Sequence, residues 1–97
     1  MSTPKAPPGT FTILYFASAS SHTGKSHDFL SAPLKITELY DVLEKKYPGF
    51  REKVLESGAV TVNLEYVDME EELGKNEACA VIDAGDEVGI IPPVSSG

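Results

Sequence analysis

The chain ends in a segment whose residue types could do chemistry. Ile90-Ile91 is an apolar, strand-like pair, and it is followed by Pro92-Pro93 and then by Val94-Ser95-Ser96-Gly97. Because proline fixes φ and has no backbone N–H, a sheet strand cannot continue through Pro92-Pro93, so we expect residues 94–97 to project from the fold. A terminal glycine presents a carboxylate with no side chain beside it, which a narrow active site of another enzyme can accommodate. A frayed terminus without function is the alternative.

A second segment resembles a phosphate-binding loop. Residues 19–26, ASSHTGKS, follow an apolar run and have alanine in the place of the first glycine. Such a loop needs a helix that begins at its Lys-Ser pair, so that the helix dipole faces the anion. The next residues, HDFLSAP, lack helical spacing and include Pro33. The sequence therefore disfavours a nucleotide-binding enzyme, although tight ATP binding that is lost in Lys25→Ala would restore that hypothesis.

The remaining reactive side chains do not form a recognisable site. His22 and His27 lie five residues apart beside Asp28, whereas a metal site needs three or four converging ligands, so we predict no metal. No serine or cysteine has a base and an oxyanion partner at a recognisable spacing, which argues against a self-contained hydrolase. Cys79 is the single cysteine and has small apolar neighbours, which predicts a buried hydrophobe and no intramolecular disulfide.

Size and charge limit the function classes. With 97 residues and 41% hydrophobic content, the chain is long enough for one domain with one core, and no run approaches a membrane span. The net charge of −7 argues against nucleic acid and favours a partner with a basic face. The first residues lack a secretory signal, so we expect a cytosolic protein with a disordered leader over residues 1–10.

The first half of the chain predicts two strands and a helix. Residues 11–17 are apolar and β-branched, as in a buried strand, and a polar loop over 18–24 leads to a partner strand over 25–30, with Phe29 and Leu30 facing inward. Apolar residues then recur at helical spacing over 36–47. Thr37 is the expected N-cap of that helix, and Pro48-Gly49 ends it.

The second half predicts further strands. Residues 50–55 suggest a helical turn, 59–67 alternate as one strand, 69–76 are acidic and irregular, 78–82 form a short strand, 84–86 form a turn, and 88–91 form the last strand. This order predicts an α+β fold in which a mixed sheet packs on one main helix, as in a β-grasp or ubiquitin-like roll. We expect that domain over 11–93, with a flexible tail over 94–97.

Several of these segments resemble the MoaD and ThiS family of sulfur carriers. The resemblance covers residues 11–97 and rests on the opening strand, on Thr37-Glu38-Leu39, on Val62-Asn63, and above all on Gly85-Asp86-Glu87-Val88 followed by Pro92-Pro93-Val94-Ser95 and a last glycine. The Pro-Pro-Val-Ser motif favours the molybdopterin branch of the family over carriers that serve thiamin synthesis or tRNA thiolation.

The resemblance implies a sulfur relay that depends on partner proteins. Gly97 would be adenylated by a ubiquitin-activating-like enzyme that consumes ATP, converted to a thiocarboxylate, and inserted into the large catalytic subunit of molybdopterin synthase, in a heterotetramer. The sulfur would then pass to cyclic pyranopterin monophosphate, and the carrier would bind no cofactor and catalyse nothing alone. We expect the surface that contacts the partner to include Phe16, Ile91, Pro92, Pro93, Val94, Ser95 and Ser96.

One residue departs from the family pattern, and two alternatives stay open. The pattern ends in Gly-Gly, whereas this chain ends in Ser96-Gly97, so either the partners tolerate serine or a final glycine is missing. The first alternative function is a ubiquitin-like binding module that docks through a sheet face with Phe16, Tyr66 or Ile91 exposed. The second is a sulfur carrier whose recipient is tRNA or a protein.

Overall fold

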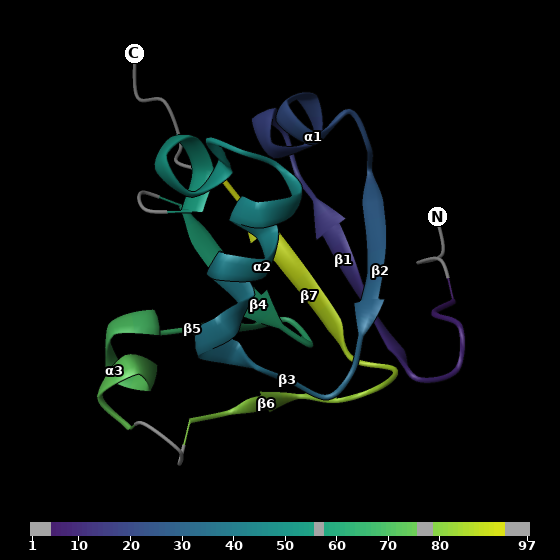
Figure 1. Ribbon diagram of the computed structural model, residues 1–97, viewed down its shortest axis with the longest axis vertical. Helices are drawn as coiled ribbons and strands as arrows, with labels where there is room; N and C mark the ends of the chain where they lie inside the picture. Colours follow the sequence, from purple (N-terminus) through teal and green to yellow (C-terminus); the bar gives the residue numbers. More distant parts are fainter. Residues whose placement is uncertain (1–4, 56–57, 76–78, 93–97) are drawn as a thin grey trace.

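A five-stranded mixed sheet organises the molecule (Figure 1). The computed structural model describes residues 5–55, 58–75 and 79–92. The strands lie in the order β2-β1-β7-β4-β5, and their bounds are β1 Thr10–Tyr15, β2 His27–Ser31, β4 Ala59–Val62, β5 Glu65–Val67 and β7 Glu87–Ile91. The pair β1 and β7 is parallel, and the other neighbours are antiparallel. Two short strands, β3 (Leu34–Lys35) and β6 (Val81–Ile82), form a separate antiparallel pair.

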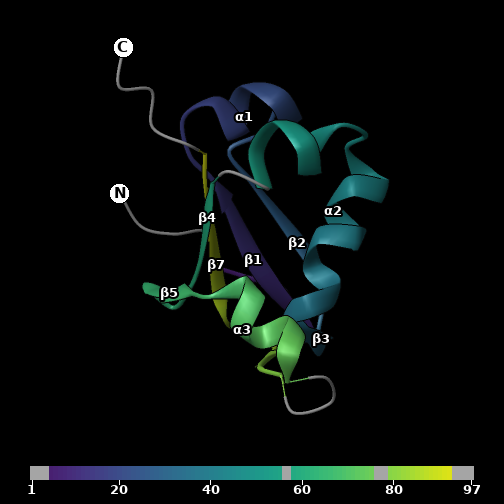
Figure 2. The same cartoon turned by 90° about the vertical axis from the view of Figure 1, so that its left-hand side faces the viewer.

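The helical segments gather on one side of this sheet (Figure 2). They are α1 (Ser18–Thr23), a 3₁₀ turn η1 (Ile36–Glu38), α2 (Leu39–Lys46), a π-helical turn η2 (Arg51–Leu55) and α3 (Met69–Gly74). Seen edge-on, the sheet has α2 and α3 on one face, and no described helix covers the other (Figure 2). No helix in the described part of the chain is long and apolar enough to cross a membrane.

The core lies between the sheet and the helices. Alternate residues of β1 and β7 point into it, and they meet the apolar faces of α2 and η2. The largest fully buried side chains are Phe11, Ile13, Ile36, Leu39, Leu43, Phe50, Val60, Ile82, Val88 and Ile90. Burial of each such side chain contributes about 1.5–3 kcal/mol, so this layer supplies most of what holds the sheet on the helices. This arrangement is the predicted β-grasp.

Most of the predicted elements are present. The expected strands over 11–17, 25–30 and 88–91 correspond to β1, β2 and β7, and the helical turn over 50–55 is η2. The main helix ends at Lys46, and Gly49 follows with a φ of 90°. Gly85 has a φ of 87°, as the predicted turn before β7 requires.

The predicted polar loop over 18–24 is wrong, because those residues form α1. Its Ala19 is fully buried, and Gly24 ends the helix in the left-handed conformation with its N–H donated to the carbonyl of Ser20. Serine and threonine favour caps and turns over helix interiors, so the local sequence of this segment does not predict a helix. Tertiary burial of one small residue and a glycine C-cap override that local preference.

The single strand predicted over 59–67 is also wrong. It is a hairpin of β4 and β5, joined by Asn63 and Leu64 with φ of 49° and 71°. Two consecutive residues with positive φ make the type of turn that fits the twist of a two-residue hairpin. Asparagine tolerates this conformation, but leucine rarely adopts it, so the turn was hard to recognise.

Three smaller expectations also differ from the structure. The acidic segment 69–76 contains α3, whose N-cap Asp68 accepts a hydrogen bond from the Glu71 N–H at 3.1 Å. Thr37 is not the N-cap of the main helix, because Glu38 holds that position, and the Thr37 hydroxyl lies 3.7 Å from the Cys79 sulfur. Leu30 packs against the core, whereas Phe29 pairs with Thr12 on the opposite face, because neighbouring residues of a strand face opposite sides.

Candidate functional site

The predicted site begins where β7 ends. Ile90 is fully buried, whereas Ile91 is only partly buried and lies on the face that carries no described helix. Pro92 is buried, and the other predicted residues of this segment, Pro93, Val94, Ser95, Ser96 and Gly97, lie outside the described residues. The terminal segment therefore begins at the end of β7, which is the central strand of the five-stranded sheet.

The helix-free face of the sheet carries a shallow apolar depression of about 210 Å³. One row of paired residues crosses its floor from β1 to β5, namely Leu14, Gly89, Thr61 and Tyr66. Phe16, Leu64, Glu87 and Ile91 complete the lining. Two predicted partner-binding residues, Phe16 and Ile91, are thus brought together on one surface, which we call the docking face and define by these eight residues.

Gly89 shapes the docking face by carrying no side chain. A Cβ built there would lie 3.2 Å from a ring carbon of Phe16 and 2.6 Å from the Thr61 hydroxyl oxygen. The Phe16 ring therefore lies close over the backbone of β7. Its backbone N–H also donates to the Ile90 carbonyl at 3.1 Å, which fixes Phe16 beside the end of β7.

The aromatic and aliphatic side chains of the docking face are unusually accessible. Phe16 is 47% exposed, Tyr66 76% and Leu64 85%. Large apolar side chains gathered on one exposed surface are typical of protein contact sites, whereas single scattered ones are common on any protein surface. The sequence pointed to Phe16, Ile91 and Tyr66. It missed the other five lining residues, Leu14, Thr61, Leu64, Glu87 and Gly89, and the available signal for Leu64 was Asn63, a residue that favours turns.

Two segments that carry the family resemblance meet beside the docking face. The Asn63 side chain accepts a hydrogen bond from the Glu87 N–H at 3.0 Å and donates one to Asp86 Oδ1 at 3.2 Å. The Asn63 backbone N–H donates to the Glu87 carbonyl at 2.7 Å. Val62-Asn63 and Gly85-Asp86-Glu87 therefore form one hydrogen-bonded unit that fixes the β4–β5 turn to the start of β7.

A buried carboxylate lies on the helical side of the sheet. Asp28 Oδ2 accepts hydrogen bonds from the hydroxyls of Tyr15, at 2.9 Å, and Tyr47, and Asp28 Oδ1 lies 3.3 Å from Lys25 Nζ. Burial alone would raise the pKa of Asp28, but the hydrogen bonds from Tyr47, Tyr15 and Lys25 outweigh it and hold that pKa below its ordinary value. Burial and the neighbouring Asp28 raise the pKa of Tyr15. These hydrogen bonds join Asp28 of β2 to Tyr47, which follows the last residue of α2, so the cluster holds β2 against that helix.

The segment similar to a phosphate-binding loop has a different structure. Lys25 and Ser26 follow Gly24 and lead into strand β2, whereas a phosphate-binding loop requires a helix to begin there. The Lys25 ammonium is paired with Asp28. The helix that a phosphate-binding loop requires therefore does not begin at Lys25 and Ser26.

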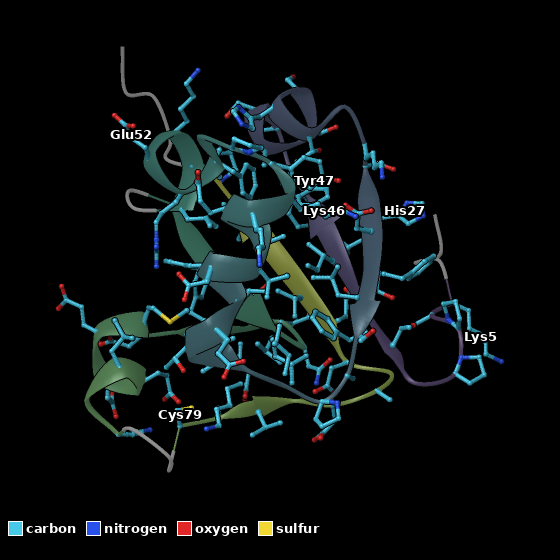
Figure 3. The ribbon with its side chains drawn as sticks, in the orientation of Figure 1. Lys5, His27, Lys46, Tyr47, Glu52 and Cys79 are labelled. Atoms are coloured by element: carbon cyan, nitrogen blue, oxygen red, sulfur yellow. The ribbon has the colours of Figure 1, made fainter. Side chains whose placement is uncertain are left out.

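The two histidines and the cysteine have separate surroundings. The His22 ring lies 5.4 Å from that of Phe50, whereas His27 contacts Ser26 and points away from Tyr47 (Figure 3). Cys79 is buried, as predicted, between α3 and β6 (Figure 3). Among the described residues, no three histidine, cysteine, aspartate or glutamate side chains are placed to hold a metal ion.

Comparison with known proteins identifies the family. The ThiS family pattern matches residues 13–97. A protein of Pyrenophora tritici-repentis named molybdopterin synthase sulfur carrier subunit is 56% identical over 93 residues, which is 96% of both chains.

Solved structures of similar proteins have the same fold. SAMP1 of Haloferax volcanii superposes with a TM-score of 0.70 at 20% identity, covering 92% of this chain and all of that one. One chain of the Helicobacter pylori complex of subunits 1 and 2 of molybdopterin-converting factor superposes with a TM-score of 0.61 at 22% identity. The match covers 91% of this chain and 99% of that one. These similarities confirm the ubiquitin-like β-grasp fold, and the match over residues 13–97 shows that this chain belongs to the ThiS family.

Proposed function

We propose that this chain is the sulfur carrier subunit of a two-subunit molybdopterin synthase and that Gly97 carries the sulfur as a thiocarboxylate. Relatives that share 56% of their residues with it over nearly their whole length carry that name. The observation that carries the proposal is the position of the docking face, which adjoins the point where β7 leads into the terminal segment. A partner bound to Phe16 and Ile91 would therefore receive the residues that follow Pro92.

The chemistry of Gly97 explains why such a carrier needs partners. A terminal carboxyl group with a pKa of about 3.5 is ionised at neutral pH and is a poor electrophile. In the proposed relay, a carboxylate oxygen attacks the α-phosphorus of ATP and pyrophosphate leaves. Sulfide (HS⁻) then attacks the acyl carbon, and AMP leaves with the former carboxylate oxygen, which yields the thiocarboxylate and releases a proton. The activating enzyme consumes the ATP, and the carrier itself binds no cofactor.

The second partner is the large catalytic subunit, in which the thiocarboxylate gives its sulfur to cyclic pyranopterin monophosphate. The solved complex of the two subunits of molybdopterin-converting factor supports a partner of this kind. The net charge of −7 and the Glu87 carboxylate on the docking face favour a partner surface with basic residues around an apolar centre. We place the relay in the cytosol, in accord with the single cysteine of the chain.

The mass of the intact chain tests the proposal. After incubation with the activating enzyme, ATP and a sulfur donor, the chain should gain about 16 Da as one carboxylate oxygen is replaced by sulfur. A chain that lacks Gly97 should fold equally well and gain nothing. No gain by the unaltered chain, with partners that are active on another carrier, would refute the proposal.

The exposed docking face also suits a ubiquitin-like module that binds a partner without sulfur chemistry. A stable complex with an unreactive terminus would identify such a module. A carrier for tRNA or protein would acquire sulfur but would fail to restore molybdopterin in an extract that lacks the carrier subunit. Restored cofactor is the expected result.

A further inference from the structure

Gly58 lies opposite the point where the terminal segment leaves the sheet. In the antiparallel pair of β4 and β7, Ala59 pairs with Ile91, so Gly58 is the next residue in register and faces Pro92. Pro92 has no N–H, so the ladder cannot continue to Gly58 through a hydrogen bond from that residue. The two residues are in close packing contact, since a Cβ built on Gly58 would lie 3.2 Å from the Pro92 Cα.

The packing around Gly58 leaves no room for a side chain. A Cβ built on Gly58 would lie 2.4 Å from the Ile91 carbonyl oxygen, 2.5 Å from the Val54 carbonyl oxygen and 3.2 Å from the Pro92 Cα. All three are backbone atoms, so no side-chain rotation can relieve the overlap. A methyl group would have to move η2, the end of β7, or both.

Space, and not backbone conformation, accounts for glycine at this position. Gly24, Gly49 and Gly85 have left-handed φ angles and no atom closer than 4.0 Å to a built Cβ, whereas the φ of Gly58 lies outside the left-handed region. An alanine could adopt the backbone conformation of Gly58. Its methyl group, however, would displace the two residues from which the terminal segment begins.

We propose that Gly58 is a positioning residue that fixes the origin and direction of the segment leading to Gly97. This inference rests on the proposed function. The buried Pro92 and the Ile91 carbonyl pack directly on Gly58, while η2 supports Gly58 from the other side through the Val54 carbonyl. The position of the Gly97 carboxylate in a partner's active site then depends on the contact between Gly58 and Pro92, which lies five residues before Gly97 in the chain.

The same geometry separates positioning from docking. Gly58 is not among the residues that line the docking face. A change at Gly58 reaches that face only through Ile91, so it should weaken partner binding less than it reduces the fraction of bound carriers whose carboxylate reaches the reacting position. In steady-state terms, kcat should fall by a larger factor than the KM for the carrier rises.

Gly58→Ala tests this inference in the adenylation and sulfur-transfer assay described above. A displacement of about 1 Å at a reacting group can lower a rate by about 100-fold, so we expect kcat for thiocarboxylate formation to fall about 10- to 100-fold. The KM for the carrier should rise by a smaller factor than kcat falls, because Gly58 itself does not line the docking face. Gly74→Ala is the matched control, since a Cβ at Gly74 meets no atom within 4 Å and its φ is not left-handed. It should behave like the unaltered chain.

Pro92→Ala approaches the same contact from the other side and adds no atom near Gly58. It keeps the inference testable if Gly58→Ala has lost its cooperative thermal transition. Pro92→Ala should lower kcat by a larger factor than it raises the KM. An unchanged kcat in a folded Gly58→Ala chain, or a raised KM with unchanged kcat in Pro92→Ala, would overturn the positioning role. If the unaltered chain gains no sulfur, the proposed function fails first, and the role of Gly58 fails with it.

Discussion

Replacement of Asp28 by asparagine tests how the domain holds β2 against α2. Asp28 accepts hydrogen bonds from Tyr15 and Tyr47 through one oxygen and pairs with Lys25 through the other. Asparagine keeps an oxygen for the two phenols, but these bonds become neutral, and its NH₂ group then faces the Lys25 ammonium. Both changes destabilise the folded state.

The structure sets the size of the effect. The Asp28 side chain is only 9% exposed, so water cannot replace its partners. A hydrogen bond to a charged group contributes about 1.5–3 kcal/mol and a neutral one about 0.5–1.5 kcal/mol, so we expect Asp28→Asn to lower the free energy of unfolding by about 2 kcal/mol. In a domain of this size that corresponds to a fall in Tm of roughly 8–15 °C. Urea and thermal unfolding at neutral pH measure both quantities.

The pH dependence gives a second, independent test. The pKa of Asp28 is lower in the folded chain than in the unfolded one, so its contribution to stability is fully present above the unfolded value of about 3.9. That contribution is lost as the pH falls through the lower, folded value. The difference in stability between the unaltered chain and Asp28→Asn should therefore be constant from neutral pH to about pH 5 and shrink in more acidic solution.

Asp41→Asn provides the control, because it makes the same chemical change at an exposed position. Asp41 pairs with Arg51 at 3.1 Å, but its side chain is 70% exposed, so we expect a loss below about 1 kcal/mol. Equal losses in the two variants, or a difference that persists unchanged in acid, would refute the view that the buried hydrogen bonds of Asp28 stabilise the fold.

Three further predictions concern the docking face and its supports. Phe16→Ala should weaken binding of the large subunit about tenfold in calorimetry, because aromatic side chains at the centre of an interface contribute most of its energy, while the Tm should change little. Leu64→Gly should raise the free energy of unfolding by roughly 0.5 kcal/mol in urea titrations, because it relieves a left-handed leucine. Asp68→Ala should lower that free energy by about 1 kcal/mol, since it removes the N-cap of α3, and an unchanged urea midpoint would contradict the role of the cap.

The sequence predicted those parts of the fold in which local pattern and burial agree. The apolar run of β1, the helical spacing of α2 and the turn at Gly85 each have one consistent interpretation, and the structure confirms them. The terminal prolines likewise showed where β7 must stop. Strand alternation required one of Ile90 and Ile91 to face outward but did not say which; in the structure Ile91 lies on the same surface as Phe16, and the partner-binding role of both stays a prediction.

Two of the missed features depend on tertiary contacts that no local pattern encodes. Helix α1 consists largely of residues that favour turns, and it is explained by the burial of Ala19 together with the Gly24 C-cap. Helix α3 did carry a signal, since Asp68 and Glu71 have the spacing of a capping box, but its acidic residues suggested an exposed loop. The proposed role of Gly58 could not be predicted from the sequence, because it depends on contacts with carbonyl groups of η2 and β7.

The position of β7 between β1 and β4 has a mechanical consequence. A pull along the chain at Pro92 loads a strand that is held on both sides, so two ladders share the force in shear and neither can be peeled from a free edge. The amide protons of such a strand exchange with solvent only when the whole domain opens. A partner can therefore draw the terminal segment into its own interior under tension while the domain behind it stays intact.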